Sequence, residues 1–251
     1  MPLNASEIME HNVKLLSPYI APILIYKHGE QDASKWLTGG SVFLAKTVDN
    51  SFLVTADHVV REIESLRAQG PIHVVLAGPG SEPIDITEWP VIARDKDIDI
   101  CILQVPSDFD ASSIAKELFE LRNWPHRQAE IGDKALIMGY PSLHREGTRN
   151  TVRIKITPIS DFVTDVGPRR FTMADETDER EVLLNPSGIE IPAHFGGMSG
   201  SPVFRMIEGA RPEFIGVFSE GGDGLSAALF CAHASFILAS GGLDYSMLPP
   251  R

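Results

Sequence analysis

The stretch "HFGGMSGSPVF", residues 194–204, decides how the rest of the chain is interpreted. Glycines lie on both sides of Ser199, and an apolar run follows Pro202. Glycine adopts positive φ and lets another backbone approach closely, so the stretch is suited to a tight turn. The same turn can present the Ser199 hydroxyl and neighbouring backbone N–H groups to a carbonyl group. Taken alone, the stretch leaves both interpretations open.

Short runs rich in Val, Ile, Leu and Phe follow one another along the chain and predict a β protein. Each run is bounded by Gly, Pro, Asp or Asn, which is typical of strands. The expected strands are "PILIYK", "GSVFLAK", "SFLVTA", "IHVVLA", "IDICILQV", "KALIMGY", "VRIKIT", "EVLLN", "SPVFRM", "FIGVFSE" and "AALFCA". Many short strands with few helices indicate an all-β fold, built as a sandwich or as barrels.

A few helical segments interrupt the strands. The predicted helices cover residues 6–16, 59–69, 110–123 and 232–240. Asn4 or Ser6 can cap the first helix, whereas Gly70 and Gly241 end the second and the last. The segment 110–123 falls near the middle of the chain, so it is expected to link two β halves.

One further segment, "ADETDERE" at 174–181, carries a run of charge with no apolar face. Such a run is expected to form a solvated loop.

The composition is that of an ordinary globular protein. The 251 residues, 43% hydrophobic and 22% charged, can bury a sizeable core. The formal charge of −12 disfavours a nucleic-acid partner, because that partner requires basic surface to replace counterions. No motif indicates a cofactor, and no histidine or cysteine spacing indicates a metal site. For Cys101 and Cys231, buried reduced thiols are favoured over a disulfide bond between them.

The N-terminus lacks the features of an exported protein. Glu7 and Glu10 stand where a signal peptide would carry positive charge. The apolar piece at 15–26 is interrupted by a serine and two prolines and is too short to span a bilayer. We therefore expect a cytoplasmic protein with no membrane partner.

A serine nucleophile needs a base, and His58 is the best placed of the eight histidines. It ends the run "SFLVTADH", in which a strand leads into a turn of small residues, a rigid mount for a reactive group. The alternative is a partly buried histidine at a strand end. His194 is close to Ser199 in sequence and could touch a substrate. The remaining histidines occur in a strand or in helix and loop contexts with no paired spacing: His11, His28, His73, His126, His144 and His233.

The third group that such a site needs is a buried carboxylate that holds the base. The segment "RDKDIDICILQV" offers Asp95, Asp97 and Asp99. Asp99 is the last acid before an uninterrupted apolar run, at the mouth of a buried strand. Asp97 has the same side-chain parity along a strand, so spacing does not force the choice. We favour Asp99 because Asp97 is nearer the solvated loop.

The order His58, Asp99, Ser199 resembles that of the chymotrypsin-like (trypsin-fold) serine peptidases. "TADHVV" is similar to the family's Thr-Ala-x-His block and "DIDICILQV" to its Asp block. "GMSGSPVF" resembles the nucleophile block, in the Gly-x-Ser-Gly-Ser-Pro form of bacterial glutamyl-endopeptidase-like members. "IGDKALIMGYP" is similar to a stretch of bacterial HtrA-like members, and "IGVFSEGG" to the strand that pairs with substrate. These blocks run through most of the chain.

The resemblance implies two antiparallel six-stranded β-barrels with the site between them. The expected parts are an N-terminal helical extension at 1–20, a first barrel at 21–125 and a second barrel at 126–251.

The resemblance also assigns roles to residues. Ser199 becomes the nucleophile, His58 the general base and then acid, and Asp99 the residue that orients it. The backbone N–H groups of Gly197 and Ser199 become the oxyanion hole. The expected substrate-binding residues are Ala193, His194, Phe195, Ser219, Glu220 and Gly221, the last three as backbone partners of an extended peptide.

The departures from the family pattern are informative. Digestive members place an Asp directly before the nucleophile to pair with a freed N-terminus, but Met198 stands here and cannot form an ion pair. Activation by that route is therefore not expected. Ala193, six residues before the serine, disfavours a trypsin-like preference for basic residues. HtrA-like members continue into a PDZ module, which is not expected in this chain.

Two functions remain as hypotheses. The leading one is a serine endopeptidase acting on a protein or peptide substrate, with a restricted substrate or a regulatory protein partner. The alternative is a catalytically silent or latent binding module on the same fold. An α/β-hydrolase requires Gly-x-Ser-x-Gly with its histidine last, whereas here Ser201 breaks the motif and His58 comes first.

Overall fold

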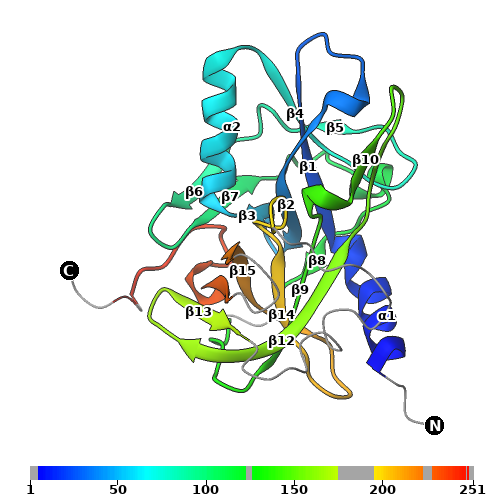
Figure 1. Ribbon diagram of the computed structural model, residues 1–251. Helices are drawn as coiled ribbons and strands as arrows, with labels where there is room; N and C mark the ends of the chain where they lie inside the picture. Colours follow the sequence, from blue (N-terminus) through cyan, green and yellow to red (C-terminus); the bar gives the residue numbers. More distant parts are fainter. Residues whose placement is uncertain (1–4, 123–125, 175–194, 223–227, 247, 249–251) are drawn as a thin grey trace.

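A computed structural model describes residues 5–122, 126–174, 195–222, 228–246 and 248 of the chain (Figure 1). The expected strand "EVLLN" and nearly all of the expected charged loop at 174–181 lie outside the described residues. Elsewhere most of the strands form two large sheets that lie one above the other in Figure 1, and a two-stranded hairpin forms a third.

The first sheet contains eight strands from the N-terminal half of the chain. Seven follow the order β5-β4-β1-β2-β3-β7-β6, and β8 pairs in parallel with β2. Their bounds are β1 Ile20–Lys27, β2 Leu37–Lys46, β3 Ser51–Thr55, β4 Ile72–Leu76, β5 Ile84–Asp85, β6 Val91–Asp95, β7 Ile100–Gln104 and β8 Phe119–Glu120. The first half therefore has more strands than the six we expected.

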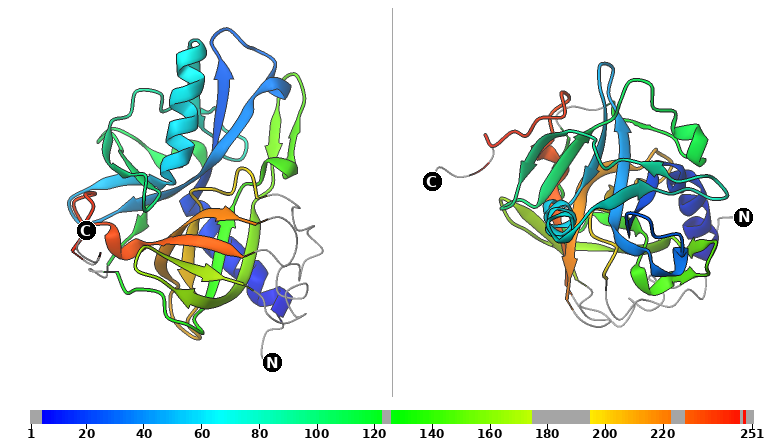
Figure 2. Two further views of the ribbon diagram at one scale, coloured as in Figure 1. Left: turned by 60° about the vertical axis from the view of Figure 1, so that its left-hand side comes forward. Right: turned by 90° about the horizontal axis from the view of Figure 1, so that it is seen from above.

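The second sheet is a closed six-stranded barrel with the order β12-β13-β16-β15-β14-β9 (Figure 2). Its strands are β9 Lys134–Gly139, β12 Thr157–Val166, β13 Arg170–Met173, β14 Pro202–Arg205, β15 Glu213–Gly221 and β16 Leu229–His233. A separate hairpin, β10 Arg145–Gly147 and β11 Val152–Ile154, stands apart from the barrel. The prediction of an all-β fold is confirmed, and the closed barrel agrees with the expected architecture.

Two α-helices are present among the described residues, and both were predicted. α1 spans Ala5–Leu16 and α2 spans Asp57–Gln69, which ends at Gly70 with φ 157°. α2 begins two residues earlier than expected, so that His58 lies in its first turn. No helix in the described part of the chain has the length and apolar character needed to cross a membrane.

The helix predicted over 110–123 is wrong. The segment forms only a 3-10 turn at Ala111–Ile114 and then the short strand β8. Ala115 adopts a left-handed conformation (φ 51°), which ends the turn. The Lys116 ammonium then donates to the Ser17 carbonyl and to Tyr140 Oη, each at 3.0 Å. These distant partners favour an extended path over a continuous helix.

The helix predicted over 232–240 is also wrong. Ala232 and His233 belong to β16 and pair with Val217 and Gly216 of β15. Only a single 3-10 turn, Ala234–Phe236, follows. Barrel closure thus overrides the helical propensity of the alanines.

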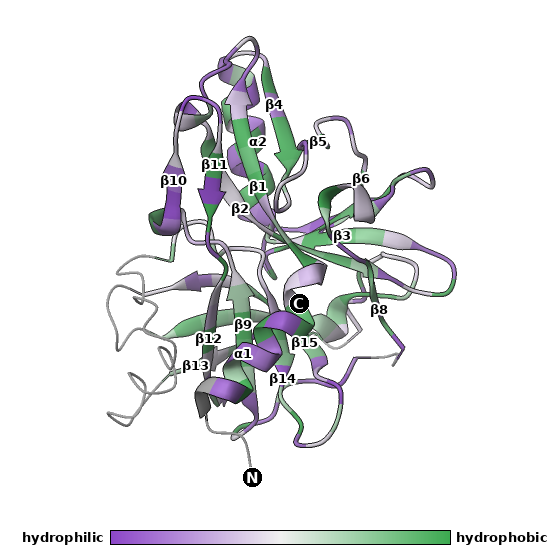
Figure 3. Cartoon of the chain, turned by 90° about the vertical axis from the view of Figure 1, so that its right-hand side faces the viewer, coloured by the Kyte–Doolittle hydropathy of each residue, from purple (hydrophilic) through white to green (hydrophobic). Residues whose placement is uncertain are grey.

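A shared apolar core joins the two sheets. The Phe43 ring of β2 packs on Phe204 of β14 and on Phe214 of β15, with ring centroids 5.6 and 4.6 Å apart. Hydrophobic residues run along β3, β4 and β15, whereas β10 is hydrophilic (Figure 3). The division of the chain at residues 20 and 125 into separate parts stays a prediction.

Candidate active site

His58, in the first turn of α2, and Asp99, in the turn just before β7, lie side by side. The Asp99 carboxylate accepts two hydrogen bonds from His58, one from Nδ1 at 2.8 Å and one from the backbone N–H at 2.9 Å. The His58 side chain is 36% exposed and the Asp99 side chain 19% exposed. A carboxylate that holds both the ring and the backbone of one histidine fixes the direction of the imidazole.

Asp97, the competing candidate, is exposed and does not take this position. Its backbone N–H donates to Asp95 Oδ1 at 2.7 Å, within the tight turn that precedes β7. Asp99 itself adopts φ 59°, a left-handed conformation that is uncommon for a residue with a side chain. Because residues 96–99 form a turn and not a strand, the alternation of side chains along a strand does not place Asp97 and Asp99 on the same face.

Each group shifts the pKa of the other. The hydrogen bond from His58 to Asp99, reinforced by the charge of the carboxylate, raises the pKa of His58 even though burial alone would lower it. Burial favours a raised pKa for Asp99, but the hydrogen bonds and charge of His58, with a hydrogen bond from Ser219, hold it below its usual value. Asp99 is therefore held as a carboxylate beside an imidazole that is a stronger base than usual.

Ser199 lies at the end of the glycine-rich turn, against the first sheet. Its backbone carbonyl accepts a hydrogen bond from Ser41 N–H at 2.8 Å. A Cβ on the neighbouring Gly200 would meet Thr55 Oγ1 at 2.2 Å and Ala56 N at 3.1 Å, so only glycine fits beside the residues that precede His58. The turn is thereby packed against the end of β3, which leads directly into the helix that carries His58.

The Ser199 hydroxyl donates to the backbone carbonyl of Ser219 at 3.0 Å. Among the described residues it has no other hydrogen-bond partner, and His58 is not one. Ser219 also connects to Asp99 through its own hydroxyl, which helps to lower the pKa of that acid. Ser219 therefore links the serine to the carboxylate of the His58–Asp99 pair.

The two backbone N–H groups expected to form the oxyanion hole have no hydrogen-bond acceptor among the described residues. They belong to Gly197 and Ser199, whereas Met198 N–H donates to the Phe195 carbonyl at 2.9 Å. Gly197 has φ 87°, and a Cβ there would meet Tyr140 O at 2.7 Å. Free amides on a rigid turn can stabilise a negatively charged oxygen.

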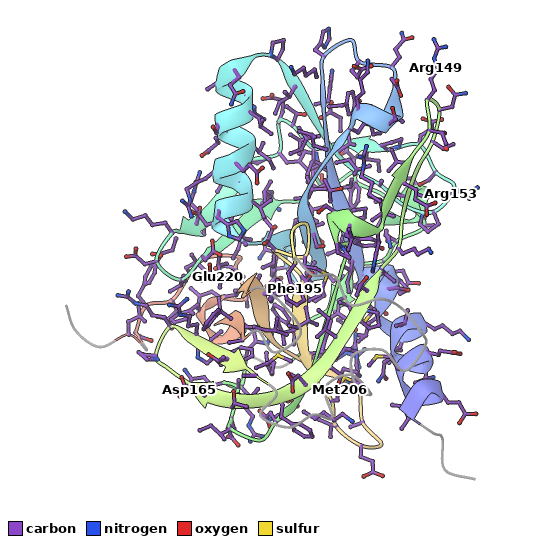
Figure 4. The ribbon with its side chains drawn as sticks, viewed as in Figure 1. Arg149, Arg153, Asp165, Phe195, Met206 and Glu220 are labelled. Carbon is purple, nitrogen blue, oxygen red and sulfur yellow. The ribbon has the colours of Figure 1, made fainter. Side chains whose placement is uncertain are left out.

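The expected substrate-binding residues are only partly described. Phe195 and Glu220 both lie where the half that carries α2 meets the barrel (Figure 4). Phe195 is buried and packs so closely on Gly221 that a Cβ there would meet its ring at 2.5 Å. Exposed Glu220 pairs with Arg170 at 3.3 Å. Ala193 and His194 lie outside the described residues.

Sequence reasoning missed an ionic cluster beside the histidine. The Asp57 side chain is only 1% exposed. Its carboxylate accepts hydrogen bonds from Arg61 Nε at 2.8 Å and from Arg94 Nε at 2.7 Å. Arg94 also pairs with Glu64 at 2.6 Å. The i,i+4 spacing of Asp57 and Arg61 was visible in the sequence, but the contact with Arg94 depends on how β6 is placed.

The comparisons with known proteins identify the family of the chain. The chain matches the family described as "Trypsin-like peptidase domain" over residues 39–217, and it belongs to that family. A comparison with curated proteins finds no match.

Solved structures show the same fold. A thermostable serine protease, AL20, from an extremophilic microorganism is 13% identical, with a TM-score of 0.51 over 90% of this chain and 92% of that one. The crystal structure of Deg5 is 16% identical, with a TM-score of 0.52 over 94% of this chain and 98% of that one. The resemblance to trypsin-fold serine peptidases is confirmed.

Proposed function

We propose that this protein is a serine endopeptidase in which Ser199, His58 and Asp99 act together. The observation that carries the proposal is the double hydrogen bond from His58 to Asp99, next to a turn that exposes Ser199 and two free amides. Membership of the trypsin-like peptidase family supports protein or peptide substrates.

The His58 ring is prepared to act as a base. Because Nδ1 lies 2.8 Å from a carboxylate oxygen, it carries the proton, and the Nε2 lone pair faces away from Asp99. The Asp99 charge stabilises the imidazolium that forms when His58 takes the proton of Ser199. His58 then passes this proton to the leaving amine.

The Ser199 hydroxyl must turn before it can react. In the structure it donates to the Ser219 carbonyl, which we propose as a backbone acceptor for an extended substrate. A substrate N–H that takes this carbonyl releases the hydroxyl, which then rotates about one single bond toward His58. Substrate binding thus prepares the nucleophile.

The reaction then proceeds by acyl transfer. Ser199 Oγ bonds to the substrate carbonyl carbon, and the amides of Gly197 and Ser199 stabilise the resulting oxyanion. The carbon–nitrogen bond breaks as His58 protonates the amine, which leaves an ester on Ser199. Water, activated by His58, hydrolyses that ester and restores the serine.

A fluorophosphonate probe tests the proposal. The wild-type protein should be labelled at Ser199, and Ser199→Ala should not be labelled while keeping the same melting temperature. His58→Ala should slow labelling by roughly 10³-fold or more, because the serine loses its base. Equal labelling of the wild-type protein and Ser199→Ala would refute the proposal.

The alternative is a latent or silent binding module, and the hydrogen bond from Ser199 to Ser219 favours it. A latent site reacts with the probe only when an extended peptide or a protein partner is present. Labelling should therefore be repeated with and without a library of unstructured peptides. No labelling under either condition, in a folded protein, would favour the silent module.

A restricted substrate or a regulatory partner is also part of the proposal. It is motivated by the expected cytoplasmic location, where indiscriminate proteolysis would be harmful. Incubation with unfolded casein tests it, since a restricted enzyme should leave most of the casein intact. Rapid and complete degradation would rule the restriction out.

A further inference from the structure

The carbonyl of Gly196 is held by two donors from one residue. Ser142 donates to it through its backbone N–H at 2.7 Å and through its hydroxyl at 3.0 Å. Ser142 begins a short 3-10 turn, Ser142–His144, which starts three residues after the end of β9 of the barrel. It therefore reaches the glycine-rich turn from a different part of the chain.

This contact determines the direction of one N–H group. In a trans peptide the C=O and the N–H point to opposite sides. The Gly196 carbonyl belongs to the same peptide unit as the Gly197 N–H, so when the carbonyl faces Ser142, the N–H faces away from it. That amide is one of the two that the proposed oxyanion hole requires.

The peptide between two glycines needs such a restraint. Glycine has no Cβ to oppose rotation of the adjoining peptide, so either orientation is accessible to an unrestrained Gly-Gly unit. Met198, buried and uncharged, supplies no ion pair to hold the turn. Ser41 holds the neighbouring carbonyls of Gly197 and Ser199, through its hydroxyl at 2.9 Å and its N–H at 2.8 Å. The Gly196 carbonyl is left to Ser142.

We infer that Ser142 is a positioning residue that holds the Gly196–Gly197 peptide with its N–H available to the oxyanion. The inference rests on the proposed peptidase function. Ser142 does not touch the reacting atoms and acts through the backbone of Gly197.

The backbone conformation at this position is compatible with a proline, whose Cδ would occupy the place from which the Ser142 N–H donates to the Gly196 carbonyl. A proline restricts the residue before it to an extended conformation, and Pro141 already has φ −63° and ψ 138°. Proline is also tolerated in the first turn of a helix. Ser142→Pro therefore deletes the N–H and the hydroxyl, Ser142→Ala deletes only the hydroxyl, and Ser142→Thr keeps both.

The three variants should form a graded series in kcat. Ser142→Thr should stay close to wild type, and Ser142→Ala should lose about 3- to 10-fold, the effect of one hydrogen bond. Ser142→Pro should lose about 10²-fold or more, as when an oxyanion donor is removed. KM should change little, because the oxyanion exists only after attack. Ser81→Ala is the matched control, since its hydroxyl also donates to a glycine carbonyl, that of Gly78 at 3.2 Å, away from the turn.

A second readout separates positioning from a merely structural role. A peptide aldehyde forms a tetrahedral adduct that uses the oxyanion hole, whereas a product peptide does not. Ser142→Pro should weaken aldehyde binding in parallel with kcat and leave binding of the product peptide unchanged. Equal kcat in wild type and Ser142→Pro, at equal melting temperature, would overturn the inference. If the proline variant does not fold, Ser142→Ala and Ser142→Thr are compared instead, and equal kcat in these two variants would overturn the inference.

Crystal structures of the wild type and of Ser142→Pro give a test that does not need activity. The Gly196 carbonyl should face Ser142 in the wild type and be reversed in the variant. An unchanged peptide in the variant overturns the inference even if the protein is an active peptidase. Conversely, failure of the wild type to react with the probe counts against the proposed function. The orientation of the Gly196 carbonyl in the two crystal structures still decides whether Ser142 holds this peptide.

Discussion

Asp99 illustrates what a single residue contributes to this site. It combines a left-handed backbone with a carboxylate that binds His58 twice. The strained conformation is stabilised by these contacts, and it brings the acid to the histidine although Asp97 has the same parity in sequence. The site thus depends on a local distortion that regular strand geometry would not produce.

The raised pKa of His58 predicts the pH dependence of hydrolysis. His58 accepts a proton only in its neutral form, and Asp99 favours the charged form, so the pKa lies above its ordinary value of 6.5. We expect kcat/KM to increase with pH through a midpoint above 6.5. A midpoint at or below 6.5 in a steady-state pH profile would contradict this.

Substitution of the acid tests the choice between the two aspartates. Asp99→Asn should reduce kcat by roughly 10⁴-fold, because the amide favours the wrong tautomer of His58. Asp97→Asn, an exposed neighbour, is the matched control and should keep kcat within about twofold. The prediction fails if the two variants lose similar amounts of activity in the same peptide assay.

At the scale of elements, the start of α2 is held by the Asp57 cluster. Asp57 precedes His58 and joins α2 to β6 through Arg94. Asp57→Asn should lower the free energy of unfolding by about 2 to 3 kcal/mol, less than for a fully buried pair because both arginines are partly exposed.

Urea denaturation measures this effect, with Glu64→Gln as the control. Glu64 also pairs with Arg94, but its own side chain is exposed. Loss of this pair should therefore lower the free energy of unfolding by less than about 1 kcal/mol. Equal losses of stability in the two variants would show that the burial of Asp57 contributes nothing.

At the level of the whole molecule, the reactivity of the two cysteines measures the unfolding of each half of the chain. Cys101 lies in β7 and Cys231 in β16, and both are free and buried. Burial raises the pKa of Cys101 to about 12, and it raises that of Cys231 as well. Neither thiol should react with a disulfide reagent in the native protein, and both should react in urea.

Single-cysteine variants in a Ser199→Ala background test whether the halves unfold together. Cys231→Ser leaves the thiol of the first sheet, and Cys101→Ser leaves that of the barrel. Because Phe43 packs on Phe204 and Phe214 across the junction, we expect both thiols to become reactive at one urea concentration. Two clearly separated midpoints would indicate halves that unfold independently.

Much of the β architecture could be predicted from local sequence. Runs such as "SFLVTA" and "KALIMGY" became β3 and β9 because alternation and turn residues act within a few positions. The helices at 110–123 and 232–240 were wrong because pairing with distant strands decided those segments. β12 escaped notice because Pro158 and Asp161 interrupt an apolar pattern that the barrel completes.

By itself, the sequence determined the class of fold, the order of the blocks and the identity of the serine and histidine candidates, since each carries a signal in adjacent residues. Only the tertiary structure decided that Asp99 faces His58, that Ser199 donates to Ser219, and that Ser142 holds Gly196. The last contact joins residues 54 positions apart. Hydrogen bonds of that range leave no periodic pattern in a sequence, because they form only when separate strands have been packed together.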